Sequence, residues 1–211
     1  MSGADLVSVV VPAFNAEVTL DETLRSVRGQ THEALEIIVV DDGSRDSTRA
    51  IAERHAAADP RVRVLHQLNA GVAAARNTGW QQARSPFIAF VDADDLWAPA
   101  KIERQLAALH SGGNRIGLVY CWFARIDHDS RVVALHDGPW WQGDVTQPIL
   151  TSNFIGNGSS ALIRREALVA AGGFDSALQA QGAQGCEDYL LYFRVAQAHH
   201  FALVPDRLVG Y

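Results

Sequence analysis

The carboxylates that follow residues 87–91 are the clearest chemical signal in this sequence. The run Phe-Ile-Ala-Phe-Val is apolar, and Asp92, Asp94 and Asp95 come directly after it. Buried parallel strands have such continuous apolar runs, and ligands of open α/β sheets bind beyond the carboxyl ends of the strands. While the backbone stays extended, Asp92 and Asp94 project from the same side and repel one another unless a cation lies between them. Carboxylate oxygens suit Mg²⁺, Mn²⁺ or Ca²⁺, so we predict a cation site; an acidic turn that caps the next helix is the alternative.

A second apolar run ends in carboxylates in the same way. Residues 35–40 (Leu-Glu-Ile-Ile-Val-Val) lead into Asp41 and Asp42. Since the carboxyl ends of parallel strands meet at one edge of a sheet, a site shared with Asp92 is expected. The alternative is a turn in which one Asp caps the following helix. One carboxylate can serve both purposes, because it can also accept a hydrogen bond from a ligand N–H such as the imide of uracil.

Arg76 lies on an otherwise small and apolar helix face. Val72, Ala75, Arg76 and Gly79 follow the helical spacing i, i+3, i+4, i+7 in the segment 71–83. A guanidinium on a face that packs against a sheet is costly unless it is paired. Its candidate partners are the Asp clusters or a bound diphosphate, which arginine can grip through two hydrogen bonds. A purely structural ion pair with an Asp is the other interpretation.

Glu187 and Asp188 begin a further helical pattern. Acidic residues are favoured in a first helical turn, so a helix cap is the default interpretation. Asp188, however, shares the inward-facing stripe of Leu191, Tyr192 and Val195. An inward carboxylate after the Gly- and Gln-rich loop 179–185 fits a general base that accepts a proton from a substrate hydroxyl.

The elements that must position these residues follow an α/β pattern. Over the first 110 residues strands and helices alternate, which is typical of a mostly parallel sheet with helices on both faces. After residue 115 the alternation weakens. We expect strands at 6–11, 35–40, 61–65, 87–91, 116–123, 131–135, 159–163, 201–204 and 208–211, and helices at 20–28, 46–58, 71–83, 99–109, 164–171 and 187–198.

Composition narrows the class of protein. The 211 residues suit one domain, and the net charge of −6 without a basic run argues against nucleic acid as a partner. No apolar stretch approaches the roughly 20 residues needed to span a bilayer, and the first residues lack the features of a signal peptide. Cys121 and Cys186 are too few for a disulfide framework, and Cys121 lies in a strand-like run typical of the core. We therefore expect a cytoplasmic protein. The chain ends directly after a strand-like segment, so we also expect it to be the core of a longer protein.

Together these segments resemble the inverting family 2 glycosyltransferases with the GT-A fold. The resemblance spans nearly the whole chain in the family's order. The matching stretches are residues 9–15 (Val-Val-Val-Pro-Ala-Phe-Asn), 40–44 (Val-Asp-Asp-Gly-Ser), 71–79 (Gly-Val-Ala-Ala-Ala-Arg-Asn-Thr-Gly), 90–95 (Phe-Val-Asp-Ala-Asp-Asp), Arg164-Arg165 with 172–175 (Gly-Gly-Phe-Asp), and Glu187-Asp188. It implies a Rossmann-like central sheet with a nucleotide-sugar donor, usually UDP-linked, across its strand ends.

The resemblance also implies roles for individual residues. The donor-binding positions would be Pro12, Ala13, Asn15, Asp41, Asp42, Arg76, Asp92 and Ala93. Pro12 and Asp42 would border the base, with Arg76 nearby. Asp92 would approach the ribose or the sugar. Asp94, together with Asp95, would hold Mn²⁺ or Mg²⁺. Asp188 would be the catalytic base, and Glu187 would bind the acceptor or orient the site.

The same resemblance implies a division of labour along one catalytic domain, residues 1–211. Residues 1–110 would bind the nucleotide sugar, and residues 111–211 would form a smaller region that binds a saccharide or glycolipid-type acceptor. The Gln-x-x-Arg-Trp signature of processive synthases is absent, so we expect single additions, with peripheral association at the cytoplasmic face of a membrane as an option. Within the second half, residues 156–159 (Gly-Asn-Gly-Ser) are expected on the acceptor side.

Two other functions compete with this one. A sugar-phosphate nucleotidyltransferase shares the strand-end carboxylates but needs a Gly-rich loop with Arg or Lys directly after the first strand. Here that position holds Pro12-Ala-Phe-Asn15, and no basic residue follows until Arg25. A non-catalytic module that binds nucleotide sugars would have disrupted carboxylates, whereas Asp92, Asp94 and Asp188 are all present.

Overall fold

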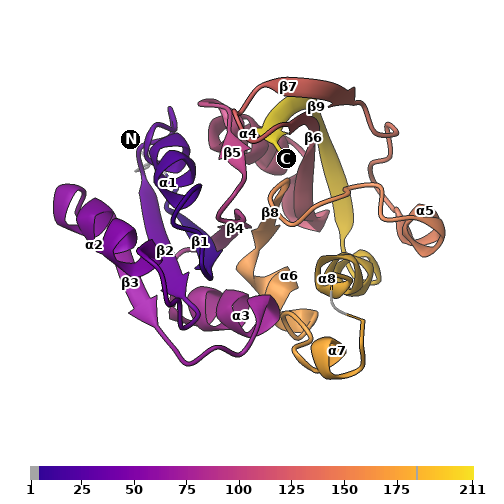
Figure 1. The fold of residues 1–211 in the computed structure, drawn as a ribbon. Helices are drawn as coiled ribbons and strands as arrows, with labels where there is room; N and C mark the ends of the chain where they lie inside the picture. The colour runs from indigo at the N-terminus through magenta and orange to yellow at the C-terminus, as the bar shows by residue number, and fades with distance from the viewer. Residues whose placement is uncertain (1–4, 184) are drawn as a thin grey trace.

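The computed structural model describes residues 5–183 and 185–211. Residues 1–4, on which the expected lack of a signal peptide depends, and residue 184 of the loop 179–185 lie outside this part. One sheet of nine strands forms the centre of the molecule (Figure 1). In chain order the strands are β1 (Val7–Ala13), β2 (Leu35–Asp41), β3 (Val62–His66), β4 (Phe87–Phe90), β5 (Leu96–Trp97), β6 (Ile116–Ile126), β7 (Val132–His136), β8 (Ala161–Arg164) and β9 (His200–Gly210).

Helices cover both faces of this sheet, as the alternating pattern predicts. They are α1 (Leu20–Arg28), α2 (Thr48–Ala58), α3 (Val72–Gln82), α4 (Lys101–Ser111), α5 (Thr146–Thr151), α6 (Arg165–Ala170), α7 (Ala177–Ala180) and α8 (Glu187–Ala196), with a 3₁₀ turn at Gly113–Arg115. Helices α1, α2 and α4 contribute to the core on one face. Helices α3, α5, α6 and α8 contribute to the core on the other, and α3, α6 and α8 lie together in Figure 1. Among the described residues, no helix is long and apolar enough to cross a membrane.

The first half of the chain builds the parallel part of the sheet. Strands β3, β2, β1 and β4 lie side by side in that order, and each neighbouring pair is parallel. In the register of β1 and β2, Ala13 lies opposite Asp41. The segments that follow β1, β2 and β4 therefore leave the sheet at the same edge, where Asp42 and Asp92 to Asp95 lie.

The second half completes the sheet with mixed directions. Strand β8 is antiparallel to both β4 and β6, whereas β6 and β9 are parallel. Strands β5 and β7 add antiparallel pairs to β9 and β6. The two short strands expected at 201–204 and 208–211 are one strand, β9. Cys121 of β6 lies opposite Val204 and Trp122 lies opposite Arg207, so Pro205 and Asp206 form a bulge and the pairing continues beyond them.

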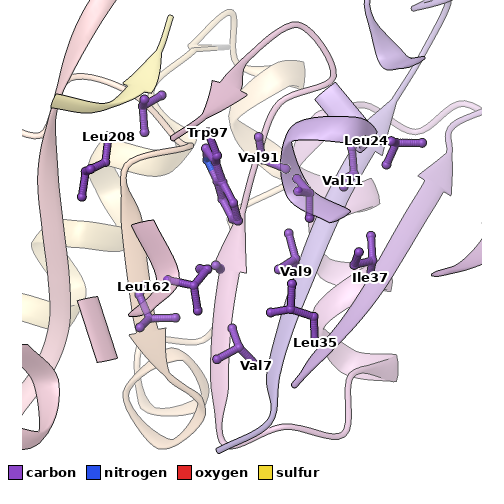
Figure 2. Close-up of a cluster of buried hydrophobic side chains, with 14 of the residues drawn as sticks. Val7, Val9, Val11, Leu24, Leu35, Ile37, Val91, Trp97, Leu162 and Leu208 are labelled. Carbon is purple, nitrogen blue, oxygen red and sulfur yellow. The ribbon is translucent and has the colours of Figure 1, made fainter. Parts of the chain in front are cut away.

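The parallel strands are buried on both faces, which explains their continuous apolar runs. On one face Val7, Val9 and Val11 of β1 pack with Leu24 of α1 and with Trp97, part of the cluster in Figure 2. On the other face Val10 packs with α3 and its neighbours. Cys121 is buried in β6, as expected, and Cys186 is exposed. The predicted α/β class is confirmed.

Candidate active site

A groove runs along the strand ends that carry the predicted binding residues. It consists of two adjoining hollows of about 270 and 360 Å³ that share Pro12, Phe14 and Val72 in their walls, and we call it the strand-end groove. Of the predicted donor-binding residues, those in its walls are Pro12, Ala13, Asn15, Asp42, Asp92 and Ala93. Asp94 lines the same end of the groove as Asp92.

Asp42 and Asp41 differ in their surroundings. Both oxygens of Asp42 accept hydrogen bonds from the segment before α3: Oδ1 from the Ala70 N–H at 2.9 Å and from Gln67 Nε2 at 2.7 Å, and Oδ2 from the Gly71 N–H at 2.9 Å. Asp42 thus fixes the start of α3 and also lines the groove. Asp41 is buried and does not line the groove; its Oδ1 accepts the Ser44 N–H at 3.1 Å, as in a turn, and its Oδ2 lies 3.3 Å from His66 Nδ1 of β3.

Arg76 joins the two halves of the site. It is buried on α3; its Nη2 donates to Asp92 Oδ1 at 2.6 Å and its Nη1 donates to Glu187 Oε1 at 3.4 Å. Its guanidinium carbon lies 5.2 Å from the ring centre of Phe174. Burial alone would lower the pKa of Arg76, but the nearby carboxylates outweigh it and raise the pKa above its ordinary value. The residue is therefore a fixed positive charge between the turn after β4 and the start of α8.

The start of α8 brings two further carboxylates to Arg76. Glu187 accepts from Arg76 and, through Oε2, from the Gly185 N–H at 2.8 Å. Asp188 is buried and faces the same region. Its Oδ1 accepts the Tyr189 N–H at 2.7 Å, and no side chain of the described residues donates to it. Burial raises the pKa of Asp188, Arg76 opposes this, and Glu187 and Asp92 add to it. Asp188 is thus an inward carboxylate with free acceptor capacity.

The carboxylates after β4 do not stay in an extended segment. The Asp95 N–H donates to the Asp92 carbonyl oxygen at 3.1 Å, which closes a turn. The expectation that Asp92 and Asp94 project from the same side of an extended strand therefore does not apply. Asp94 is exposed and lines the groove. Asp95 is buried, accepts a hydrogen bond from the Ser159 hydroxyl and does not line the groove, although both residues border a neighbouring hollow. Burial and the nearby charge of Asp92 raise the pKa of Asp94 and raise that of Asp95 to about 8.

These residues fit a divalent cation that is shared with a phosphorylated ligand. Within the described ranges, no group of three or more His, Cys, Asp or Glu side chains is arranged to hold a metal by itself. Mg²⁺ is usually bound by one or two carboxylates plus phosphate oxygens and water, so such a group is not required. Asp92 and Asp94 would supply two oxygen ligands. Burial and, after it, the charge of Asp92 raise the pKa of Asp94, and a cation between the two carboxylates would offset their repulsion.

Several residues of the groove were not among those predicted from the sequence. Phe14, Asn69, Val72 and Gln179 also line it. Phe14 is an apolar side chain exposed at the end of a buried strand, between two predicted residues, and that position was a usable signal. Gln179 comes from α7, far along the chain, and no local pattern links it to β1. The segment 156–159 approaches Arg76 and Asp92 directly, since a Cβ on Gly158 would lie 2.7 Å from Arg76 Nη2.

Comparison with known protein families places most of this chain within one of them. The sequence model of the family described as Glycosyl transferase family 2 matches residues 8–170. The chain is 40% identical over 126 residues to the uncharacterized glycosyltransferase EpsJ of Bacillus subtilis, which covers 60% of this chain and 36% of that protein. It is 37% identical over 128 residues to the UDP-Glc:alpha-D-GlcNAc-diphosphoundecaprenol beta-1,3-glucosyltransferase WfgD of Escherichia coli, which covers 60% of this chain and 49% of that protein. The chain thus matches less than half the length of either relative.

Solved structures share the fold. S. aureus TarS 1–349 in complex with UDP-GlcNAc aligns with a TM-score of 0.78 at 22% identity, over 98% of this chain and 58% of that one. The mannosyltransferase PcManGT from Pyrobaculum calidifontis, in complex with GDP-Man and Mn²⁺, aligns with a TM-score of 0.72 at 21% identity, over 100% of this chain and 57% of that one. These likenesses confirm the GT-A fold expected from the sequence.

Proposed function

This chain belongs to glycosyl transferase family 2, and from that premise we propose that it moves a sugar from a UDP-sugar to an acceptor hydroxyl with inversion, assisted by Mn²⁺ or Mg²⁺. One observation carries the proposal: Arg76 pairs with Asp92 at the end of the strand-end groove and with Glu187, the residue before Asp188. The proposed donor-binding carboxylate thus pairs with one nitrogen of the buried Arg76 guanidinium, and the proposed base is the neighbour in sequence of the carboxylate that pairs with the other nitrogen.

The strand-end groove would hold the donor. Asp42 lies at one end and Pro12 where the two hollows meet, suited to border the base. Asp92 and Asp94 lie at the other end, suited to the ribose and the diphosphate. Asp42 already accepts three hydrogen bonds from the protein, so its contact with a uracil imide would be an additional one. The complexes of TarS with UDP-GlcNAc and of PcManGT with GDP-Man and Mn²⁺ support a nucleotide-sugar donor.

Asp188 would act as the general base. A carboxylate with free acceptor capacity can hold the acceptor hydroxyl and take its proton as the oxygen attacks the anomeric carbon. Attack from the face opposite the leaving diphosphate inverts the configuration, and no enzyme nucleophile is needed. When bound, the divalent cation would offset the charge that develops on the leaving diphosphate. Arg76 would hold Asp92 and Glu187 in place on either side of the reacting groups.

We further propose that residues 1–211 act as one catalytic domain, with the acceptor bound by the second half. The sheet that runs through both halves supports this, because β8 of the second half lies directly beside β4 of the first. A saccharide or lipid-linked saccharide is the proposed acceptor class, in keeping with the diphosphoundecaprenol substrate in the name of WfgD. The reaction would take place in the cytoplasm, at a membrane surface if the acceptor is lipid-linked.

The test combines binding and product analysis. The melting temperature should rise with UDP plus Mn²⁺, rise less with UDP alone, and stay constant with CDP or AMP. Incubation with a panel of UDP-sugars and acceptor saccharides should then release UDP. Release of pyrophosphate from a nucleoside triphosphate and a sugar phosphate would instead identify a nucleotidyltransferase. Binding of UDP-sugars without UDP release from any acceptor would favour the non-catalytic module.

A further inference from the structure

The hydroxyl of Ser159 forms hydrogen bonds with two residues of the turn after β4, Asp92 and Asp95. Ser159 is buried. Its Oγ accepts the Asp92 backbone N–H at 3.0 Å and donates to Asp95 Oδ2. A hydroxyl can accept and donate at once, which neither a carbonyl nor an amide N–H can do. The first and last residues of the turn after β4 are therefore held by one side chain from a segment 64 positions further along the chain.

The backbone around Ser159 connects the same turn to α8. The Ser159 carbonyl accepts from Trp97 Nε1 at 3.1 Å, and the Ser159 N–H donates to Asn157 Oδ1 at 3.0 Å. The carbonyl of Asn157 accepts from the hydroxyl of Tyr192 at 3.0 Å. Tyr192 lies one helical turn after Asp188, so the segment 157–159 ties the turn that bears Asp94 to the helix that bears the proposed base.

The residue before Ser159 is confined by the ion pair of the site. A Cβ on Gly158 would lie 2.7 Å from Arg76 Nη2 and 3.5 Å from Asp92 Oδ2. The backbone of the segment therefore rests against the Arg76–Asp92 pair. This contact leaves Ser159 little freedom to shift relative to Asp92.

From this geometry we propose that Ser159 is a positioning residue for cation binding. It anchors the turn through Asp95, so that Asp94 faces the groove as a metal ligand while Asp95 serves as the anchor and is not a ligand. This inference rests on the proposed function in one respect, the use of a divalent cation at Asp92 and Asp94. Without the hydroxyl, the Asp92 N–H loses its acceptor, Asp95 loses its donor, and the turn is free to move away from the geometry that binds the cation.

The neighbouring Ser160 provides a matched control. It is equally buried, but its hydroxyl has no hydrogen-bond partner within the described residues. Ser159→Ala and Ser160→Ala therefore remove the same atom from adjacent buried positions. Within the described residues, only the Ser159 Oγ forms hydrogen bonds to the turn.

The experiment measures Mn²⁺ affinity directly, by electron paramagnetic resonance of free Mn²⁺ during titration of the protein with UDP present. Ser159→Ala should weaken Mn²⁺ binding about tenfold, because a buried N–H and a buried carboxyl both lose a partner. Ser160→Ala should stay within about twofold of the parent protein, since no hydrogen bond is lost. Melting temperatures of both variants show whether each remains folded at the temperature of the titration.

Variants of the two carboxylates separate anchor from ligand. Asp95→Asn keeps an oxygen that accepts from Ser159, so it should weaken Mn²⁺ binding less than about threefold, whereas Asp94→Asn should weaken it more than about tenfold. The double variant Ser159→Ala/Asp95→Ala should bind Mn²⁺ no more weakly than Ser159→Ala alone, because the serine variant already removes the Ser159–Asp95 hydrogen bond.

Two results would overturn the proposal alone while leaving the proposed function intact. In one, Ser159→Ala binds Mn²⁺ as tightly as Ser160→Ala does. In the other, Asp95→Asn loses as much affinity as Asp94→Asn. Parent protein that binds no Mn²⁺ in the presence of UDP would contradict this proposal and the metal dependence of the proposed function together.

Discussion

Asp188 is the residue on which the proposed chemistry depends most directly. Asp188→Asn keeps the size of the side chain but removes the proton acceptor, so kcat should fall by about 10²- to 10⁴-fold. Calorimetric affinity for UDP should be unchanged, because Asp188 is not part of the strand-end groove. Asp206→Asn, which removes a carboxylate paired with Arg104 on the surface, is the control and should retain full turnover. Retained turnover in Asp188→Asn would assign the base elsewhere.

The raised pKa of Asp188 also predicts the acid limb of the rate profile. The base form is lost as the pH falls through the folded-state pKa, which burial holds above the ordinary value of about 4. The plot of log kcat against pH should therefore bend downward on the acid side at a pH above that value. The same shift means that the folded state binds this proton more tightly than the unfolded chain, so the group's contribution to stability falls as the pH rises. A profile that stays flat down to pH 4 would show that another group takes the proton.

Arg76 is the second residue whose replacement should change both the stability of the fold and the binding of UDP. Arg76→Ala leaves Asp92 and Glu187 without the guanidinium that they pair with. Breaking a buried ion pair in this way typically lowers the free energy of unfolding by about 3 to 5 kcal/mol. Urea unfolding should show a loss of this size, together with weaker UDP binding. Arg76→Lys should recover only part of it, because one ammonium does not reproduce two divergent N–H groups. Unchanged stability in Arg76→Ala, with UDP affinity lost, would make Arg76 a ligand-binding residue rather than the support of the site.

At the scale of elements, the close contact of α3 with the sheet determines where Arg76 lies. Gly79 follows Arg76 by three residues on the same helix face, and a Cβ there would lie 2.3 Å from Val10 Cγ1 of β1. Gly79→Ala should therefore push α3 away from β1 and destabilise the fold by about 1 to 3 kcal/mol, despite the better helix propensity of alanine. The free energy of unfolding, measured by chemical denaturation, and the affinity for UDP should both fall.

The control for this change is Gly138→Ala. There the nearest atom to an added Cβ is 3.4 Å away, and the backbone needs no left-handed conformation. Its unfolding free energy should stay within about 0.5 kcal/mol of the parent. A Gly79→Ala protein as stable as this control would mean that α3 can shift without effect on β1.

The elements also show what the sequence could and could not predict. Strands β1, β2 and β4 and helix α3 were predictable because apolar runs and helical spacing are local properties. The place of β8 between β4 and β6 was not, since it depends on pairing between distant segments. For the same reason the carboxylates could be named, but the inward turn of Asp95 could not, because its partner Ser159 lies 64 residues away.

The core between α4 and the sheet encloses the charged side chain of Lys101. Lys101 is fully buried; its Nζ donates to Gln105 Oε1 at 2.8 Å and lies 4.0 Å from the ring centre of Trp97. Burial lowers the pKa of Lys101 to about 8, and the nearby Cys121 opposes this. Because the unfolded chain holds this proton more tightly, stability should rise by about 3 kcal/mol as the pH increases from 8 towards 10.5.

Lys101→Met isolates this contribution. The variant lacks the titrating group, so its stability relative to the parent should be highest near pH 7 and should decline across the same pH range. Denaturant unfolding at several pH values measures the difference. A difference that is independent of pH would show that Lys101 keeps its ordinary pKa in the folded protein.

The contrast between the two cysteines has a practical consequence. Cys121 is enclosed in β6, whereas Cys186 is exposed at the residue that precedes Glu187. A maleimide spin label or fluorophore would therefore attach at one position of the native sequence, beside the proposed acceptor side of the site. The mobility or emission of that label would report the arrival of donor, cation and acceptor in separate steps, without any engineered substitution.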